Sequence, residues 1–285
     1  MQIIECPRDA MQGISQFIPT QTKIEYLNSL LKVGFHTLDF GSFVSPKAIP
    51  QLGDTAEVLS ELNLTTTQTK LLAIIANERG ANDALSHPEV NYLGYPLSIS
   101  ETFQQRNTNR SIAHAIEDVS RIQEMCSKAD RELVTYISMG FGNPYGDPYS
   151  VEIVDQFSDI LATLGVNIIS LSDTIGVAQP DQIGELFSRL SSKYPGVQFG
   201  VHLHSNPDTA SGKVKAALNA GCNRFDGAIL GFGGCPMAED ELVGNINTRT
   251  ILSEIKSKSI SLDLNMEAFK AAEIIAAERV FGKYN

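Results

Sequence analysis

Long apolar runs are missing from this sequence, and none approaches the roughly 20 residues that a membrane-spanning helix requires. The opening residues 1–5 also lack the basic start and apolar stretch of a secretory signal, and the arginine-rich character of a transit peptide. We therefore expect a protein that does not associate with membranes and that is located in the cytoplasm.

Basic residues are scarce as well. The chain has 22 Lys and Arg against 33 Asp and Glu, which gives a formal net charge of -11. General nucleic-acid binding relies on clustered Lys and Arg that neutralise phosphates, so this composition argues against it. An anionic substrate would have to be held by a few cations placed close to it.

Closely spaced cysteines are also missing. The four cysteines lie far apart and form neither a Cys-x-x-Cys pair nor the dense framework of a small secreted domain. They are Cys6, Cys126, Cys222 and Cys235. Each is expected to be a free thiol in a reducing compartment.

The sequence does contain a regular alternation of short apolar runs and longer segments of helical period. Eight such units follow one another, which is the pattern of repeated strand-helix units in a parallel sheet. The expected strands are Ile3–Cys6, Thr37–Phe40, Lys70–Ile75, Val90–Leu93, Leu133–Ser138, Ile168–Leu171, Gln198–His202 and Arg224–Ala228.

The segments between these strands read as helices with one apolar stripe, as in Thr20–Val33 and Ser111–Ala129. Nothing resembles an interdomain linker, and α/β barrels commonly occupy about 250 residues as one unit. The sequence therefore predicts an α/β fold, a single TIM (β/α)8 barrel over residues 1–285. Met266–Phe281 is expected to form an additional C-terminal helix. Helix ends are expected just before Gly34, Gly165 and Gly221.

Polar motifs fall at the C-terminal ends of the expected strands. They are Arg8-Asp9 after the first strand, Asp39 in the second, Asp173 after the sixth, His202 and His204 at the seventh, and the glycine-rich stretch 231–235 after the eighth. In a barrel of this kind those ends converge on one mouth, where active sites are built from several loops. We therefore expect these side chains to meet.

Two histidines separated by one residue point to the same side of an extended strand, so His202 and His204 are candidate metal ligands. Asp9 adds a carboxylate, and Asn245 offers an amide oxygen from a late turn. This mixed oxygen and nitrogen set, without a cysteine ligand, favours Mg²⁺ or Mn²⁺ over structural zinc. The alternatives are two hydrogen-bonded core histidines and an Asp9 that only caps a turn.

Three further residues are candidates for catalysis. Arg8 at the mouth suits the stabilisation of a developing enolate, although a salt-bridging arginine is the common alternative. Cys235, on a glycine-rich loop, is a candidate proton donor or simply part of a tight turn. Asp173 has an active-site role or bonds to its own backbone turn. The acidic run 239–241 is read as a solvated loop face.

Several stretches also resemble the 3-hydroxy-3-methylglutaryl-CoA lyase family in order and spacing over nearly the whole chain. These stretches are CPRDAMQ at 6–12, GSFVSPK at 41–47, SDTIG at 172–176, VHLH at 201–204 and GFGGCP at 231–236. The Ser-Phe-Val-Ser-Pro-Lys stretch and the loop with Cys235 are the more specific ones, because related Claisen-type condensing enzymes share the Arg-Asp and His-x-His elements.

The resemblance implies a metal-dependent barrel enzyme, a homodimer, that splits hydroxymethylglutaryl-CoA, an acyl-CoA, into acetyl-CoA and acetoacetate. It implies that Arg8 stabilises the thioester enolate and Cys235 helps to protonate it, while Asp39, Asp173 and His202 take part in catalysis. The implied metal ligands are Asp9, His202, His204 and Asn245. The implied substrate contacts are Gln12, Ser42, Asn107, Ser170 and Thr174.

The chain departs from the family pattern at several positions. Asp39 stands where the family carries glutamate, Ala10 replaces a glycine, and Ser205 replaces an acidic residue. The loop between Cys235 and Asn245 is one residue longer than usual. Two alternative functions therefore stay open. One is a related aldolase or Claisen condensing enzyme that acts on a 2-oxo acid, and the other is a non-catalytic barrel that binds acyl-CoA.

Overall fold

Eight parallel strands close into a barrel in which each strand pairs with the next and β8 pairs with β1. The structure is a computed structural model that describes residues 1–234 and 243–284. The strands are β1 Gln2–Glu5, β2 Thr37–Ser42, β3 Lys70–Ile74, β4 Val90–Ser98, β5 Glu132–Ser138, β6 Ile168–Asp173, β7 Gln198–Leu203 and β8 Arg224–Gly227. The predicted TIM barrel and all eight predicted strands are confirmed.

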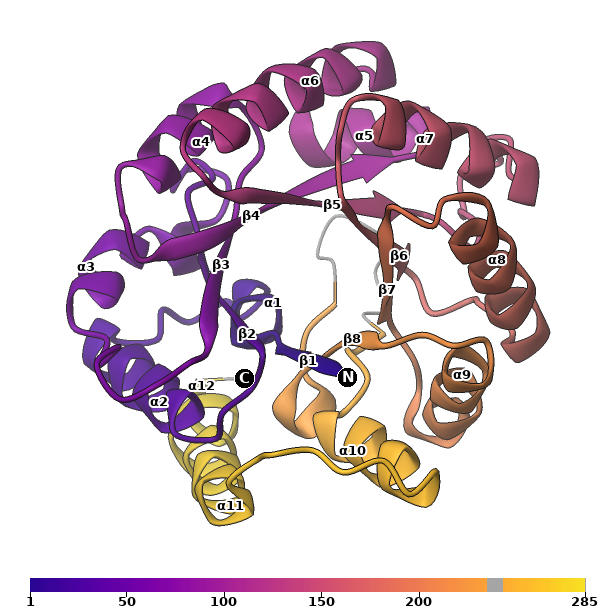
Figure 1. The fold of residues 1–285 in the computed structure, drawn as a ribbon. Helices are drawn as coiled ribbons and strands as arrows, with labels where there is room; N and C mark the ends of the chain where they lie inside the picture. Colours follow the sequence, from indigo (N-terminus) through magenta and orange to yellow (C-terminus); the bar gives the residue numbers. More distant parts are fainter. Residues whose placement is uncertain (235–242, 285) are drawn as a thin grey trace.

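Helices surround the barrel, so Figure 1 shows the strands as an inner ring and the helices as an outer one. The α-helices are α1 Pro7–Gln12, α2 Thr20–Leu31, α3 Thr55–Ser60, α4 Glu78–Leu85, α5 Glu101–Thr108, α6 Ile112–Lys128, α7 Val151–Thr163, α8 Pro180–Lys193, α9 Pro207–Asn219, α10 Thr248–Ser257, α11 Met266–Ile275 and α12 Gly282–Tyr284. Short helical turns are η1 Pro50–Leu52, η2 Ile229–Gly231 and η3 Ala276–Phe281.

The helices begin and end where the local chemistry favours it. Ser111 and Ser150 each accept a backbone hydrogen bond from the first turn of the helix that follows, which satisfies an N–H group that would otherwise lack a partner. The expected helix ends at Gly34, Gly165 and Gly221 are confirmed, because all three glycines adopt a positive φ between 82° and 89°. The predicted helix boundaries are therefore set by single residues.

Strand β4 continues to Ser98, five residues beyond the predicted end at Leu93. Gly94 and Pro96, which lie in the added part of the strand, both weaken a strand in general. In the barrel Gly94 allows close packing, since a Cβ atom at this position would lie 2.5 Å from Cδ1 of Ile74. The barrel interior, which the sequence does not reveal, thus overrides the local propensity.

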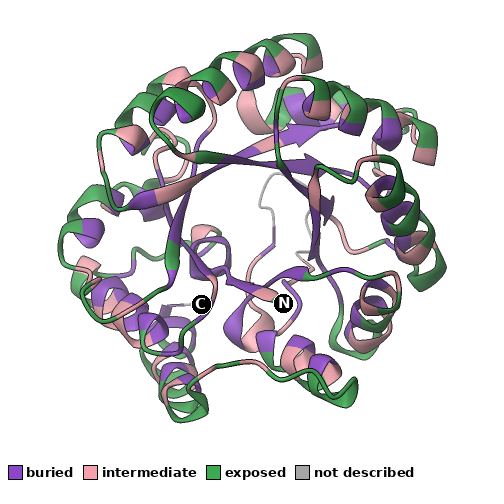
Figure 2. Cartoon of the chain, viewed as in Figure 1, coloured by how far each residue is buried: buried purple, intermediate pink, exposed green. Residues whose placement is uncertain are grey.

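Apolar side chains fill both faces of the sheet. Figure 2 shows buried strands inside a ring of helices whose outer faces are exposed. A compact cluster inside the barrel contains Leu72, Ile74, Val134, Tyr136 and Ile168. A larger cluster packs the helices onto the outer face of the strands. Among the described residues, we find no helix with the length and apolar character needed to cross a membrane.

The C-terminal segment packs on the outside of the barrel beside α2, as Figure 1 shows. The expected single helix Met266–Phe281 is α11 followed by a π-helical turn, η3. Phe269 in α11 is fully buried, and its ring meets that of Phe35 edge to face with 6.2 Å between the centroids. This helix is therefore part of the core.

We expect Phe269→Ala to lower the free energy of unfolding by about 3–5 kcal/mol, because it leaves a cavity against Phe35. Urea unfolding followed by circular dichroism measures the change. Met266→Ala is the matched control on the same helix, since Met266 is 43% exposed, and its effect should stay within about 0.5 kcal/mol. Equal stability of the two variants would contradict a core role for α11.

Candidate metal centre and active site

The two histidines at the end of β7 bring their rings together at the barrel mouth. His202 and His204 are both buried, and their Nε2 atoms lie 3.2 Å apart. His202 Nδ1 lies 3.2 Å from Oδ2 of Asp226, and His204 Nδ1 lies 3.0 Å from the carbonyl oxygen of Thr174. Because each Nδ1 faces an acceptor, each imidazole carries its hydrogen on Nδ1. The Nε2 atom of each ring then has a free lone pair that can bind a metal ion.

Two nitrogen lone pairs that face each other at this distance repel unless a positive charge lies between them. A shared proton can supply that charge, and the pKa of His202 is indeed raised: burial alone would lower it, but the hydrogen bond to Asp226 and the charge of Asp9 outweigh burial. A divalent cation supplies the charge more strongly. The donor atoms of this pair therefore fit a metal ion.

Asp9 completes a group of three candidate ligands. One donor atom each from Asp9, His202 and His204 lie within 4.8 Å of one another, and all three residues are buried. Burial would raise the pKa of Asp9, but Arg8 and the imidazoles hold it well below its usual range. Burial and the neighbouring imidazole lower the pKa of His204 to about 4. An ionised carboxylate beside a neutral imidazole is the state that binds metal.

Asn245, the fourth predicted ligand, lies next to this group. Its Nδ2 donates to Oδ2 of Asp9 at 2.7 Å and to the carbonyl oxygen of Phe232 at 3.0 Å. The amide nitrogen thus faces Asp9, and a half-turn of the amide group would present its oxygen instead. The sequence prediction places the residue correctly beside the carboxylate, while its role as a ligand stays a prediction.

Arg8 lies between two carboxylates. Helix α1 begins with Pro7 directly after β1 and Cys6, so Arg8 and Asp9 both lie in its first turn at the barrel mouth. The Nε and Nη2 atoms of Arg8 bond to Asp39, the closest distance being 2.6 Å, and Nη1 bonds to Oδ1 of Asp9 at 2.8 Å. The guanidinium is therefore fixed in place with a permanent charge.

Asp39 acts on this guanidinium and does not belong to the candidate ligand group. Both of its oxygens accept hydrogen bonds from Arg8. Burial raises the pKa of Asp39 to about 6, even though the charge of Arg8 opposes that shift. The shorter side chain of aspartate is thus sufficient to orient Arg8.

Asp173 is saturated by partners of its own. Oδ2 accepts from Nζ of Lys213 at 2.7 Å and from the backbone of Ala178, while Oδ1 accepts from the backbone of Val177. Lys213 also donates to the carbonyl oxygen of His204 at 2.8 Å. These contacts give Asp173 a structural role in shaping the mouth, and its predicted part in catalysis stays a prediction.

The predicted substrate contacts lie at different depths. Gln12 bonds to both Arg8 and Asp9, and Thr174 accepts a hydrogen bond from the backbone of Met139. The hydroxyl of Ser42 bonds to nearby backbone groups, and Asn107 lies on α5 near its end. Ser170 is fully buried and pairs with Gly200, two residues before His202, so it lies one layer beneath the imidazoles.

Cys235 and the acidic run 239–241 lie outside the described residues. Gly233, two residues before Cys235, is packed directly against two of the candidate metal ligands, Asn245 and Asp9. Gly233 has a φ of +106°, and a Cβ atom there would lie 2.5 Å from Nδ2 of Asn245 and 2.9 Å from the carbonyl oxygen of Asp9. Only glycine fits at this position.

Two residues of the site escaped the sequence analysis. Asp226 bonds to the ring of His202, and Lys213 neutralises Asp173. A signal existed for Asp226, since two charged residues separated by one position in the predicted strand Arg224–Ala228 must share one side of the sheet. Lys213 gave no signal, because a lysine on a helix is ordinarily exposed.

Comparison with known proteins agrees with this geometry. Residues 2–275 match the family described as HMGL-like. A Bacillus subtilis (strain 168) hydroxymethylglutaryl-CoA lyase is 32% identical over 266 residues, which cover 93% of this chain and 88% of that protein.

Solved structures of HMG-CoA lyases are also similar to this chain. A crystal structure of the Bacillus subtilis HMG-CoA lyase superposes with a TM-score of 0.91 at 31% identity, over 98% of this chain and 93% of that one. An Acinetobacter baumannii HMG-CoA lyase in complex with coenzyme A and 3-methylmalate has a TM-score of 0.90 at 29% identity, over 98% and 91%.

We expect Lys213→Met to lower the free energy of unfolding by about 3–5 kcal/mol, because it leaves the buried Asp173 carboxylate without its cation. The double variant Asp173→Asn/Lys213→Met should lose less than the sum of the two single losses, as chemical denaturation would measure. Lys215→Met on the same helix is the control, since the Lys215 side chain is 55% exposed. Additive losses would refute the pairing.

Proposed function

The chain belongs to the HMGL-like family, and we propose that it cleaves 3-hydroxy-3-methylglutaryl-CoA to acetyl-CoA and acetoacetate at the Asp9, His202 and His204 group with the help of a divalent metal ion. It is a carbon-carbon lyase of the kind that its relatives represent. The observation that carries the proposal is the placement of the fixed Arg8 guanidinium against the buried ligand group.

Asp9, His202, His204 and Asn245 are the residues that would hold the metal ion. Oxygen and imidazole ligands without thiolate favour Mg²⁺ or Mn²⁺. When bound, such an ion supplies Lewis-acid chemistry, which lowers the pKa of an alcohol and orients the oxygens around it. The substrate class is supported by the related lyase that was solved with coenzyme A and 3-methylmalate.

Arg8 supplies the charge that the reaction needs. Once a base has removed the proton of the tertiary alcohol, the bond between the alcohol carbon and the CH₂ group of the thioester breaks. The alcohol carbon becomes the ketone of acetoacetate, and the electron pair of the broken bond forms the thioester enolate. A guanidinium that is already fixed by Asp39 and Asp9 stabilises this enolate without moving.

Proton transfers complete the reaction. We assign protonation of the enolate carbon to the thiol of Cys235. His202 takes part as a candidate ligand of the ion, because its Nδ1 carries a hydrogen toward Asp226 and its Nε2 lone pair faces the ligand group. Support for Cys235 comes from the sequence motif. Asp173 acts through its contacts with Lys213 and the backbone, and Asp39 acts through Arg8.

Binding of the acyl-CoA substrate is assigned to the mouth of the barrel. Gln12 already bonds to both Arg8 and Asp9, which supports its contact with substrate. The family resemblance suggests four further substrate contacts, which are Ser42, Asn107, Ser170 and Thr174.

We also propose that residues 1–285 act as one catalytic domain, that the protein is a homodimer, and that it is cytoplasmic. Buried free thiols at Cys6, Cys126 and Cys222 fit a reducing compartment.

A substrate panel with and without chelator tests the proposed function. We expect formation of acetoacetate from hydroxymethylglutaryl-CoA with Mn²⁺ or Mg²⁺, and its loss with EDTA. Consumption of acetyl-CoA with pyruvate or 2-oxoisovalerate would instead identify a condensing enzyme. Acyl-CoA binding by calorimetry without turnover of any substrate at high enzyme concentration would leave a non-catalytic barrel.

Arg8→Met should lower kcat by at least about 10²–10³-fold, because the enolate loses its counter-charge. Mn²⁺ binding, measured by electron paramagnetic resonance, should persist because Arg8 carries no ligand atom. Arg79→Met, at an exposed arginine of α4, provides the control and should keep parental activity. An Arg8 variant with parental kcat would remove Arg8 from the mechanism.

A further inference from the structure

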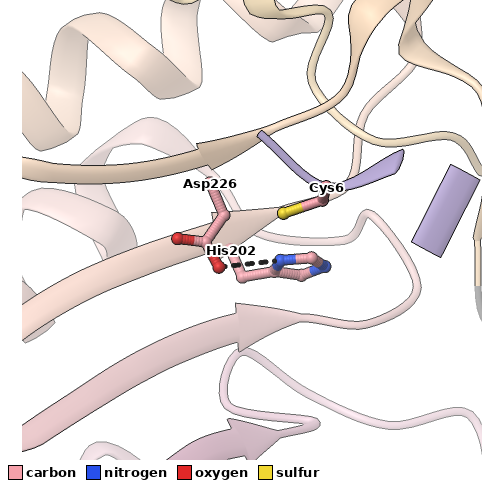
Figure 3. Close-up of side chains that lie close together, drawn as sticks. All are labelled: Cys6, His202 and Asp226. Atoms are coloured by element: carbon pink, nitrogen blue, oxygen red, sulfur yellow. Dashed lines mark hydrogen bonds and ion pairs between the residues drawn. The ribbon is translucent and has the colours of Figure 1, made fainter. Parts of the chain in front are cut away.

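Beneath the candidate metal centre, on the far side of the His202 ring, lies a second group of side chains. Figure 3 shows Cys6, His202 and Asp226, which come from the end of β1, from β7 and from β8. All three residues are buried, and one possible ligand atom from each lies within 4.8 Å of the others. The group faces Nδ1 of His202, whereas the candidate metal centre faces Nε2 of the same ring.

Asp226 is held against this ring by the barrel itself. Strands β7 and β8 pair so that His202 lies opposite Asp226. Oδ2 of Asp226 accepts from Nδ1 of His202 at 3.2 Å, and the carboxylate side chain has no exposed surface. Oδ1 has no hydrogen-bond partner among the described residues. A carboxylate that served only to hold the barrel together would bond to backbone or to a cation, as Asp173 does.

Cys6 bonds to the backbone of β1 and not to the His202 ring. Its Sγ donates to the carbonyl oxygen of Ile4 at 3.7 Å, so the sulfur carries its hydrogen. Burial and the neighbouring carboxylates raise the pKa of Cys6 well above its usual range, which agrees with a neutral thiol. The interaction in this group that acts on the ring is therefore the hydrogen bond between His202 and Asp226.

The ring of His202 has a second support in Tyr136. The Tyr136 ring meets it edge to face, with 5.7 Å between the centroids and an angle of 85°. Packing of this kind restricts rotation of the imidazole but does not decide which nitrogen carries the hydrogen. Among the residues that the structure describes, Asp226 is the acceptor at Nδ1 and makes that choice. The two contacts have separate effects and are separable by mutation.

We propose that Asp226 is a positioning residue, which fixes the Nδ1–H tautomer of His202 and thereby aims the lone pair of Nε2 at the metal ion. The inference rests on the proposed function, because it assumes that His202 is a metal ligand. A carboxylate acceptor behind a ligating imidazole fixes the orientation of the ring and raises its basicity. The ring of His204 has a neutral carbonyl oxygen as its acceptor instead, so the two candidate ligands differ in the charge behind their rings.

The first experiment is a Mn²⁺ titration of the metal-free full-length chain, followed by electron paramagnetic resonance. For Asp226→Asn we expect the Kd for Mn²⁺ to rise about 10–100-fold. The melting temperature of the metal-free variant should be kept or raised, because a buried charge with an unpartnered oxygen has been removed. A merely structural role would instead lower that melting temperature.

Cys6→Ser is the matched control, since Cys6 belongs to the same buried group but has no hydrogen bond to the ring. It should bind Mn²⁺ with parental affinity. Parental affinity in Asp226→Asn would overturn the proposal. A second equivalent of Cd²⁺ bound by the parent, and lost in Cys6→Ser, would also overturn it and establish a second metal site.

A second measurement needs no variant at Asp226. The chain has only five histidines, so labelling histidine with ¹⁵N gives a simple long-range ¹H–¹⁵N spectrum in which Mn²⁺ broadens the rings that lie near it. At pH 8.5 without metal, we expect hydrogen on Nδ1 of His202. Hydrogen on Nε2 with a bare Nδ1 would overturn the proposal. Absence of Mn²⁺ broadening in the parent would overturn the proposed function instead, so the two failures are distinguishable.

Discussion

The repulsion between two imidazole nitrogens that face each other at 3.2 Å is the constraint on which the rest of the site depends. Each ring is held from behind, His202 by Asp226 and His204 by the carbonyl oxygen of Thr174, so neither ring can turn away. Asp9 places negative charge on the same side, and Arg8 keeps that carboxylate ionised. The protein thus holds two nitrogen lone pairs close together, and their repulsion is relieved only by a cation or a proton between them.

Local contacts accommodate two departures of this chain from the family pattern. Asp39 reaches both the Nε and Nη2 atoms of Arg8, so the loss of one methylene relative to glutamate leaves the guanidinium clamped. Ser205 bonds to the carbonyl oxygen of Asn206 and shares a hydrogen bond with Thr209 at the start of α9. The hydroxyl is satisfied locally, and one negative charge fewer lies behind the second histidine.

Much of this arrangement was predictable, because the polar residues of the site follow directly after the strands that position them in the sequence. Asp9 and the two histidines were placed at one mouth by counting strands, and the barrel confirms their meeting. The remainder depends on register between strands. Asp226 reaches His202 only because β7 and β8 pair at that level, and Lys213 reaches Asp173 from a helix 40 residues away. Neither the pairing level nor the direction of a helix face can be read from local spacing. The orientation of the Asn245 amide likewise depends on its neighbours.

The pairing of β8 with β1 closes the barrel, and Asp9 bonds to Asn245 across 236 positions of sequence. Loop closure over such a span is entropically costly and belongs to the late events of folding. The candidate ligand group therefore forms only when β8 has docked against β1 and closed the barrel. A metal ion held by this group would stabilise only the closed barrel, because an ion that binds the native state alone shifts the folding equilibrium toward that state. The site in this sense reports that the barrel has closed.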